Sequence, residues 1–291
     1  MYDTILVPSD GSSGAENAVP RALDFARTFG ASIHVLSVVD TGSEPAGLDR
    51  DEHDELRQPS EKRGRQATAR VHEQATDIGL EATRTVRDGI PHRTILEYAD
   101  EHGVDLIVMG THGRTGPELV RLGSTTERVS SLADAPVLAV PLTDGDRIDA
   151  DAIGYDRVVI ATDGSDAAER AAQRGFDVAA SYGSDVYAIY VIDTTTYDLE
   201  DAPRSIIGLL KEGGQHAVDE LSTAGRDRDL SVQTDVLRGV PDEEIAEYTE
   251  GIGGDLLVMG TRGRGGATGD LLGSTVARVL QRTTRPILTV E

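Results

Sequence analysis

Two glycine-rich stretches that lie 150 positions apart constrain the fold of this chain more than any other feature. The first runs from Gly110 to Ser124 and the second from Gly260 to Ser274. Each follows an apolar run and opens into a segment with helical character. Both stretches place their glycines at the same spacing, namely Gly110, Gly113 and Gly123 in the first and Gly260, Gly263 and Gly273 in the second. The sequence therefore predicts an internal duplication.

A strand, a glycine-rich loop and the start of a helix together form a phosphate cradle. Glycines let the backbone approach an anion closely, and the helix N-terminus supplies free N–H groups and the positive end of its dipole. We expect Ser124 to cap the following helix and to offer its hydroxyl to a phosphate oxygen. The alternative is a turn needed only for folding, but such a turn requires fewer glycines than these.

The rest of the chain repeats in the same order, which predicts two domains, residues 1–142 and 155–291, joined by an acidic linker at 143–154. Strands are expected in the first half at 4–8, 33–39, 82–87, 106–110 and 135–140, and helices at 15–29, 61–78, 91–102 and 124–132. Matching strands are expected in the second half at 157–161, 186–191, 256–260 and 286–290. Residues 40–58 are polar and contain two glycines and a proline, so they predict a long surface loop.

Strands that alternate with helices predict an α/β fold in which each half has a doubly wound parallel sheet with helices on both faces. Ligands of such sheets bind at the carboxyl ends of the strands, where the strand order reverses. The glycine loop follows the fourth strand, and turns containing Asp10 and Asp163 follow the first strand of each half. If the first and fourth strands are neighbours, both segments line one crevice. The two aspartates are equally consistent with a local Asx-turn or an N-cap of the first helix.

The charge of the chain is −23, and only Lys62 and Lys211 of its 28 basic residues are lysines. Such a surface is typical of proteins in multimolar salt, where self-repulsion is screened over about 3 Å, although an ordinary acidic protein is the alternative. The charge argues against binding to nucleic acid or anionic membranes. The absence of cysteine excludes disulfides and thiolate catalysis. With no signal peptide expected from the N-terminal residues and no apolar run of roughly 18 residues, we expect a cytoplasmic protein.

These motifs resemble the universal stress protein family, here as a tandem pair. The family pattern of glycine, two residues, glycine, nine residues, glycine and serine or threonine occurs in both halves. The resemblance implies a five-stranded sheet of order 3-2-1-4-5 in each half and ATP as the ligand, with Mg²⁺ held mainly by its phosphates. It also implies pairing of the fifth strands, 137–140 with 287–290, as an internal pseudo-dimer, with a further homodimer open.

The resemblance places adenosine near the ends of the first and second strands and the phosphates on the glycine loops. The residues that it implies in the first half are Pro8, Asp10, Val38, Val39, Gly110, Gly113, Arg114, Gly116, Gly123, Ser124 and Thr125. Their counterparts in the second half are Ala161, Asp163, Val191, Ile192, Gly260, Gly263, Arg264, Gly273, Ser274 and Thr275. Arg114 and Arg264 are equally consistent with solvated surface arginines. The halves differ at His112 against Arg262 and at Pro117-Glu118 against Ala267-Thr268. An acid near the phosphates is expected to weaken the first site slightly if it points inward.

Three functional hypotheses follow from these residues. The first is a nucleotide-binding stress or regulatory protein without efficient turnover, because the chain shows no nucleophile–base pair, catalytic lysine or Walker pattern. The second is an adenylating enzyme, which needs a glycine-serine loop directly after the first strand, where this chain has Pro8-Ser-Asp-Gly. The third is an adaptor that keeps the fold without binding nucleotide. AMP and cyclic nucleotides remain alternatives to ATP, and the seven histidines show no repeated spacing of metal ligands.

Overall fold

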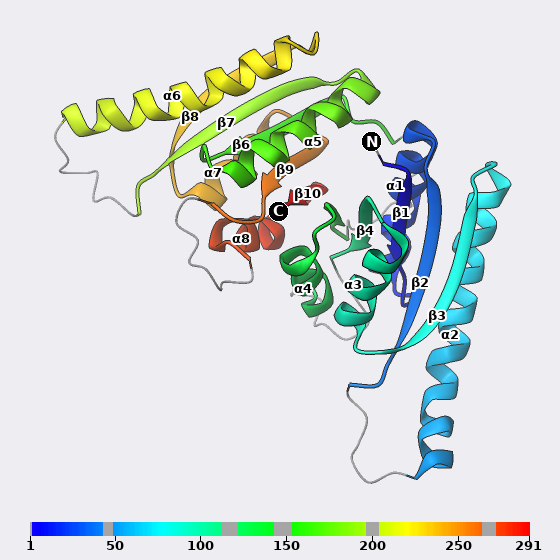
Figure 1. The fold of residues 1–291 in the computed structure, drawn as a ribbon. Coiled ribbons are helices and arrows are strands. Elements are labelled where there is room, and N and C mark those ends of the chain that lie inside the picture. Colours follow the sequence, from blue (N-terminus) through cyan, green and yellow to red (C-terminus); the bar gives the residue numbers. More distant parts are fainter. Residues whose placement is uncertain (1, 43–48, 112–121, 143–152, 196–203, 264–271) are drawn as a thin grey trace. The chain divides into compact units, whose positions relative to one another are not determined.

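Both halves of the repeat fold as α/β units with parallel sheets (Figure 1). The structure is a computed structural model that describes residues 2–42, 49–111, 122–142, 153–195, 204–263 and 272–291. The chain divides into two units, residues 1–153 and 154–291. The predicted linker lies almost entirely outside the described residues.

The first unit alternates strands and helices along the chain. Its elements are β1 (Thr4–Pro8), α1 (Ser13–Phe29), β2 (Ser32–Asp40), α2 (Arg50–Asp77), β3 (Ala82–Gly89), α3 (Pro91–His102), β4 (Leu106–Gly110), α4 (Ser124–Leu132) and β5 (Val137–Val140). The strands lie in the order β3-β2-β1-β4-β5, and the pairs are parallel. Because β1 lies between β2 and β4, the strand order reverses at β1, and this reversal creates a crevice at the carboxyl ends of β1 and β4.

The second unit repeats this arrangement. Its elements are β6 (Arg157–Thr162), α5 (Asp166–Tyr182), β7 (Asp185–Asp193), α6 (Arg204–Arg226), β8 (Val232–Gly239), α7 (Pro241–Gly251), β9 (Leu256–Gly260), α8 (Ser274–Arg282) and β10 (Ile287–Val290). Strand β6 pairs with β7 on one side and with β9 on the other. Strand β8 then pairs with β7, and β10 pairs with β9. The reversal therefore falls at β6.

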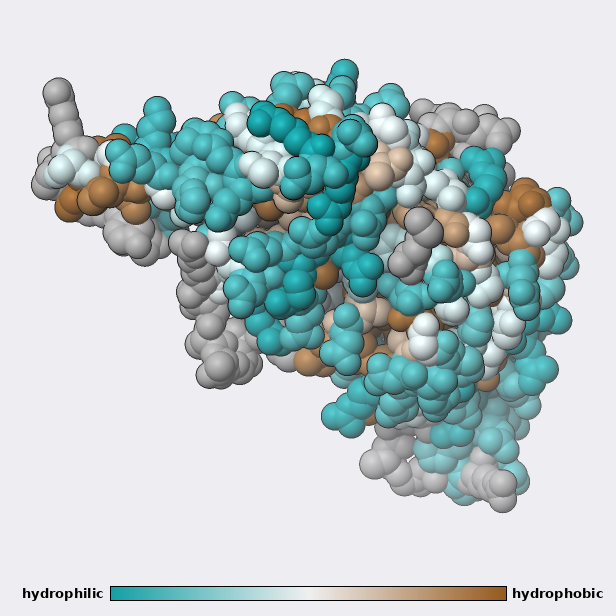
Figure 2. Space-filling view, turned by 45° about the horizontal axis from the view of Figure 1, so that its top comes forward, coloured by the Kyte–Doolittle hydropathy of each residue, from teal (hydrophilic) through white to brown (hydrophobic). Residues whose placement is uncertain are grey.

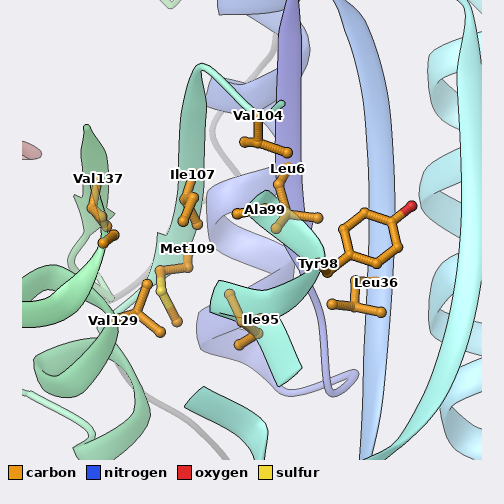
Figure 3. Close-up of a cluster of buried hydrophobic side chains, with 11 residues drawn as sticks. Leu6, Leu36, Ile95, Tyr98, Ala99, Val104, Ile107, Met109, Val129 and Val137 are labelled. Carbon is orange, nitrogen blue, oxygen red and sulfur yellow. The ribbon is translucent and has the colours of Figure 1, made fainter. Parts of the chain in front are cut away.

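Side chains from both faces of the sheet in the first unit form its core. Figure 3 shows the layer between the sheet and helices α3 and α4, in which Ile95 and Val129 point toward Ile107 and Met109 of β4. Leu6 and Leu36 extend this cluster under α3, and all of these side chains are buried. Alternate residues of the strands pack against α1 and α2 on the opposite face. Strands buried on both faces explain the continuous apolar runs that the sequence shows.

The prediction that residues 40–58 form a loop and that the second helix starts near residue 61 is wrong. Helix α2 begins at Arg50, after a capping box in which Asp49 Oδ1 accepts from the Glu52 N–H and Glu52 Oε2 accepts from the Asp49 N–H. Pro59 lies inside the helix and does not end it. The prediction failed because the first turns of α2 carry no apolar stripe. Residues 43–48 lie outside the described part of the chain.

The exposed face in Figure 2 is largely hydrophilic, with hydrophobic residues in small separate groups. This surface agrees with the 51 acidic residues of the chain. In the described ranges, none of the helices has the length and apolar character required to span a membrane.

Candidate functional site

The turn that follows β1 begins the candidate site. Asp10 Oδ1 accepts a hydrogen bond of 3.0 Å from the Ser12 N–H, which makes a local Asx-turn. Ser12 is the N-cap of α1, and its Oγ accepts from the Ala15 N–H at 3.2 Å. The Asx-turn interpretation of Asp10 is therefore confirmed, and the N-cap interpretation is wrong. Gly11 between them has φ +74°, a conformation that favours glycine.

The turn that follows β6 has the same construction. Asp163 Oδ1 accepts from the Ser165 N–H at 3.0 Å, and Ser165 caps α5 by accepting from the Ala168 N–H. Gly164 has φ +72°. In both units the turn is made through Oδ1 of the aspartate.

The last residue of β4 packs directly on the first turn of α1. A Cβ atom on Gly110 would lie 2.2 Å from the carbonyl oxygen of Gly14, so no side chain fits there. The corresponding Gly260 is also confined, with the carbonyl carbon of Ala167 at 2.8 Å from such a Cβ. These glycines bring the end of the strand that leads into the loop against the helix that follows the aspartate turn.

The two ends of each glycine loop are joined by a backbone hydrogen bond. The Gly123 N–H donates to the Thr111 carbonyl at 2.5 Å, and the Gly273 N–H donates to the Thr261 carbonyl at 2.8 Å. Both bonds hold the start of the following helix beside the end of the preceding strand. Four predicted residues, Gly113, Arg114, Gly116 and Arg264, lie outside the described part of the chain.

Helices α4 and α8 begin without a side-chain cap. Their N-caps are Gly123 and Gly273, and no side-chain hydrogen bond satisfies either cap. The expectation that Ser124 caps α4 is wrong, because Ser124 and Ser274 are the first helical residues. Both serines are exposed. Neither N-cap therefore contributes a side chain to the N–H groups of the first turn, where the positive end of the dipole lies.

In the second unit the aspartate turn and the loop stem meet. A Cβ atom on Gly263 would lie 2.4 Å from Asp163 Oδ2, and one on Gly273 would lie 3.7 Å from the Arg262 Cα. The turn after β6, the start of the glycine loop and the N-terminus of α8 thus lie next to one another at the carboxyl end of the sheet. This convergence is what the sequence predicted if the first and fourth strands were neighbours.

The remaining predicted residues lie at the same edge of each sheet. Val38 and Val39 are near the end of β2, Val191 and Ile192 are near the end of β7, and Pro8 ends β1. Ala161 is the last residue but one of β6, and Thr125 and Thr275 are the second residues of α4 and α8.

Sequence reasoning did not identify Thr126 as part of the first site. Its buried Oγ1 donates to the Gly110 carbonyl at 2.8 Å and so fixes α4 to the end of β4. The repeat could not have revealed this residue, because its counterpart in the second unit is Val276. Within the described residues, no group of three or more His, Asp or Glu side chains has an arrangement that could hold a metal ion.

Two doubly wound units, each with a glycine loop that leads from its fourth strand to an uncapped helix, define the class of this protein. A profile described as the universal stress protein family matches residues 1–141 and 154–291. The chain therefore belongs to the universal stress protein family and contains two copies of its domain.

Individual relatives agree with this assignment. The universal stress protein MJ0531 of Methanocaldococcus jannaschii is 38% identical over 140 residues, which are 47% of this chain and 82% of that protein. A universal stress protein of Mycolicibacterium smegmatis is 30% identical over 225 residues, covering 73% of this chain and 70% of its own. The solved structure of a universal stress protein from Archaeoglobus fulgidus matches 99% of this chain and 96% of its own, with a TM-score of 0.74 and 21% identity, which supports the fold.

Proposed function

We propose that both halves bind ATP and that the protein acts as a nucleotide-dependent regulator of a stress response. The phosphates lie at the N-termini of α4 and α8, and Mg²⁺ is held mainly by the phosphates. The ribose and base lie at the ends of β1 and β2 or of β6 and β7, next to Asp10 or Asp163. Occupancy biases the conformation of the glycine loops, which a partner protein then recognises.

The observation that carries this proposal is the contrast between two pairs of helices. Ser12 and Ser165 cap α1 and α5, which lie beside the same crevices, whereas α4 and α8 begin at glycines without a side-chain cap. A bound phosphate satisfies such N–H groups and meets the positive end of the dipole. The arrangement occurs in both units, each time with its loop stem closed by the same backbone bond.

The proposed function is regulation with slow ATP hydrolysis or none, because none of the described side chains assigned to the site forms a nucleophile–base pair. An adenylating enzyme is the competing function. A pyrophosphate-release assay distinguishes the two: sustained release at several turnovers per minute, well above that of variants with a blocked cradle, contradicts the regulatory function.

We further propose that β5 and β10 pair and make the two halves an internal pseudo-dimer in the cytoplasm. The support is the family resemblance and the apolar sequence of both strands. The cysteine-free chain allows a direct test, since one cysteine introduced in each strand forms a disulfide under oxidation only if the strands are adjacent. Scanning the positions of β5 against those of β10 covers every register. Failure of all pairs to cross-link contradicts the pairing.

Calorimetric titration of MgATP at high salt tests nucleotide binding. The parent should show two sites, and Gly123→Val and Gly273→Val should each remove one, because a valine side chain occupies the space next to the helix N-terminus. Both glycines have negative φ, −77° and −58°, which valine can adopt. A Cβ on Gly273 would lie 3.0 Å from the Thr261 carbonyl oxygen, so the fold of each variant is checked by circular dichroism. Gly213→Val is the matched control, because a Cβ there meets no atom within 4 Å.

The outcomes separate the functional hypotheses. Loss of one site in each variant, with the control unchanged, supports ATP at both cradles. An absence of binding by a folded parent chain overturns the proposal and leaves the adaptor. Tighter binding of AMP or a cyclic nucleotide than of ATP keeps the site but rejects ATP as its ligand.

A further inference from the structure

Arg262 lies at the second cradle but was not among the predicted ligands. It directly follows Thr261, the residue whose carbonyl accepts the bond that closes the loop. Its Cα would lie 3.7 Å from a Cβ on Gly273, the N-cap of α8. A guanidinium at this position is within side-chain reach of any anion bound at the start of α8.

The guanidinium of Arg262 is engaged by a carboxylate. Its Nη1 lies 3.0 Å from Glu291 Oε1, and the two side chains are 44% and 35% exposed, so solvent and dissolved anions reach the pair. Glu291 is held from the other side by Arg170 of α5, whose Nε donates to the Glu291 backbone carbonyl at 2.6 Å. The backbone bond fixes Glu291 in place, while the side-chain pair with Arg262 is free to exchange.

The first unit has the same backbone anchor without the charges. Asn17 Nδ2 donates to the Pro141 carbonyl at 2.7 Å, and these residues occupy the positions of Arg170 and Glu291. Proline has no carboxylate, so position 141 of the first unit cannot form the pair that Glu291 makes with Arg262.

We propose that Arg262 is a further phosphate-contacting residue of the second site and that Glu291 restrains it through an exchangeable ion pair. This inference rests on the proposed function, since it assumes an anionic nucleotide at α8. Binding requires Arg262 to leave the carboxylate and pair with a phosphate, and the fixed carboxylate opposes the ligand charge. Glu291 consequently weakens binding at the second site, because the ligand must replace it at the guanidinium.

The test is calorimetric titration of MgATP and AMP with the full chain, with the two sites distinguished by the Gly123→Val background. Glu291→Gln should strengthen ATP binding at the second site by about threefold or more, the affinity change that corresponds to a partly exposed ion pair. Arg262→Gln should weaken it by about fivefold and reduce the ratio of ATP to AMP affinity. The gain in Glu291→Gln should diminish as KCl is raised, because the effect is electrostatic.

Glu243→Gln is the matched control, since it removes a carboxylate from Arg282 at 3.1 Å, at the opposite end of α8. If Arg262→Gln leaves ATP affinity at the second site unchanged, Arg262 is not a phosphate contact and the inference is wrong. If Glu291→Gln weakens binding, the carboxylate positions Arg262 rather than restraining it. If the parent chain binds no nucleotide at either site, the proposed function is overturned as well. If the parent chain binds nucleotide normally and neither variant changes the affinity, only this inference is overturned.

Discussion

The close approach of β4 to α1 makes Gly110→Ala a quantitative test of how the crevice is built. The new Cβ would lie 2.2 Å from the Gly14 carbonyl oxygen and 2.4 Å from its carbonyl carbon. An ordinary contact begins near 3.4 Å, so the helix and the strand must separate by about 1.2 Å. The obstructing atoms belong to the backbone, and a change of rotamer cannot relieve the overlap.

Overpacked cores lose about 1–3 kcal/mol when side chains are able to rearrange. Because backbone must move here, we expect Gly110→Ala to lower the free energy of unfolding of the first unit by about 3 kcal/mol or more. Gly260→Ala needs a shift of only about 0.6 Å, from 2.8 Å, and should cost about 1–2 kcal/mol. Gly213→Ala, on the open face of α6, should stabilise the second unit by about 0.5–1 kcal/mol.

Urea unfolding followed by circular dichroism measures all three variants. The expected loss corresponds to a fall in Tm of roughly 6–12 °C for Gly110→Ala. Stability of Gly110→Ala within about 0.5 kcal/mol of the parent, or a larger loss in Gly260→Ala, would refute the reasoning from backbone contact. The first result would mean that α1 is not held against β4 as the structure shows, and the second that the contact distances do not rank the two costs.

Three further predictions concern the charged groups. Burial, and then the charge of His102, lower the pKa of His34 below 6.5. The unfolded chain therefore binds this proton more tightly than the folded chain, and the free energy of unfolding should decrease as the pH is lowered below about 6.5. His34→Gln should reduce this dependence in urea titrations at several pH values. The carboxylate of the buried Asp242 lies 2.7 Å from Arg282 Nε and 3.6 Å from Arg278 Nη1. Arg282→Met should therefore lower the free energy of unfolding by about 2 kcal/mol, and Arg278→Met by less than about 1 kcal/mol. Equal losses in thermal unfolding would contradict this ranking. The charge of −23 predicts a higher Tm in multimolar KCl than in dilute buffer, and a Tm that does not rise with salt would reject salt adaptation.

The repeat made the α/β class and most elements predictable from the sequence. Helix α4 has the predicted bounds. Helix α3 starts at Pro91 as predicted, because proline at the first helical position and glycine after the last, here Gly103, are strong local signals. The start of α2 was missed, since a polar helix stabilised by a capping box and surface ion pairs has no apolar periodicity to detect. Proline at position 59 also favoured a loop over a helix interior.

The candidate site was predictable where it is made of backbone. Glycine spacing revealed the loops, and the aspartate turns were identified as local structures that end the first strands. The capping residues were misassigned by one or two positions, because serine, aspartate and glycine all occur at helix starts and the sequence does not show which one has the extended N-cap conformation. Thr126 was missed because it lies outside the glycine motif that the sequence shows.

The backbone features of the site were predictable and its side-chain features were not, and the physical cause of this contrast also bears on how the two sites differ. A cradle built from N–H groups and close glycine contacts depends on backbone geometry, so both units retain it although most side chains between them have changed. The charged side chains around the cradle are not required for that geometry and are free to diverge, as Pro141 and Glu291 have done at one equivalent position. If the proposed function holds, affinity for an anion is shared by the repeats, whereas the charged side chains that modulate this affinity differ between the units. A duplicated chain can in this way present two sites of one chemistry that respond to different nucleotide concentrations.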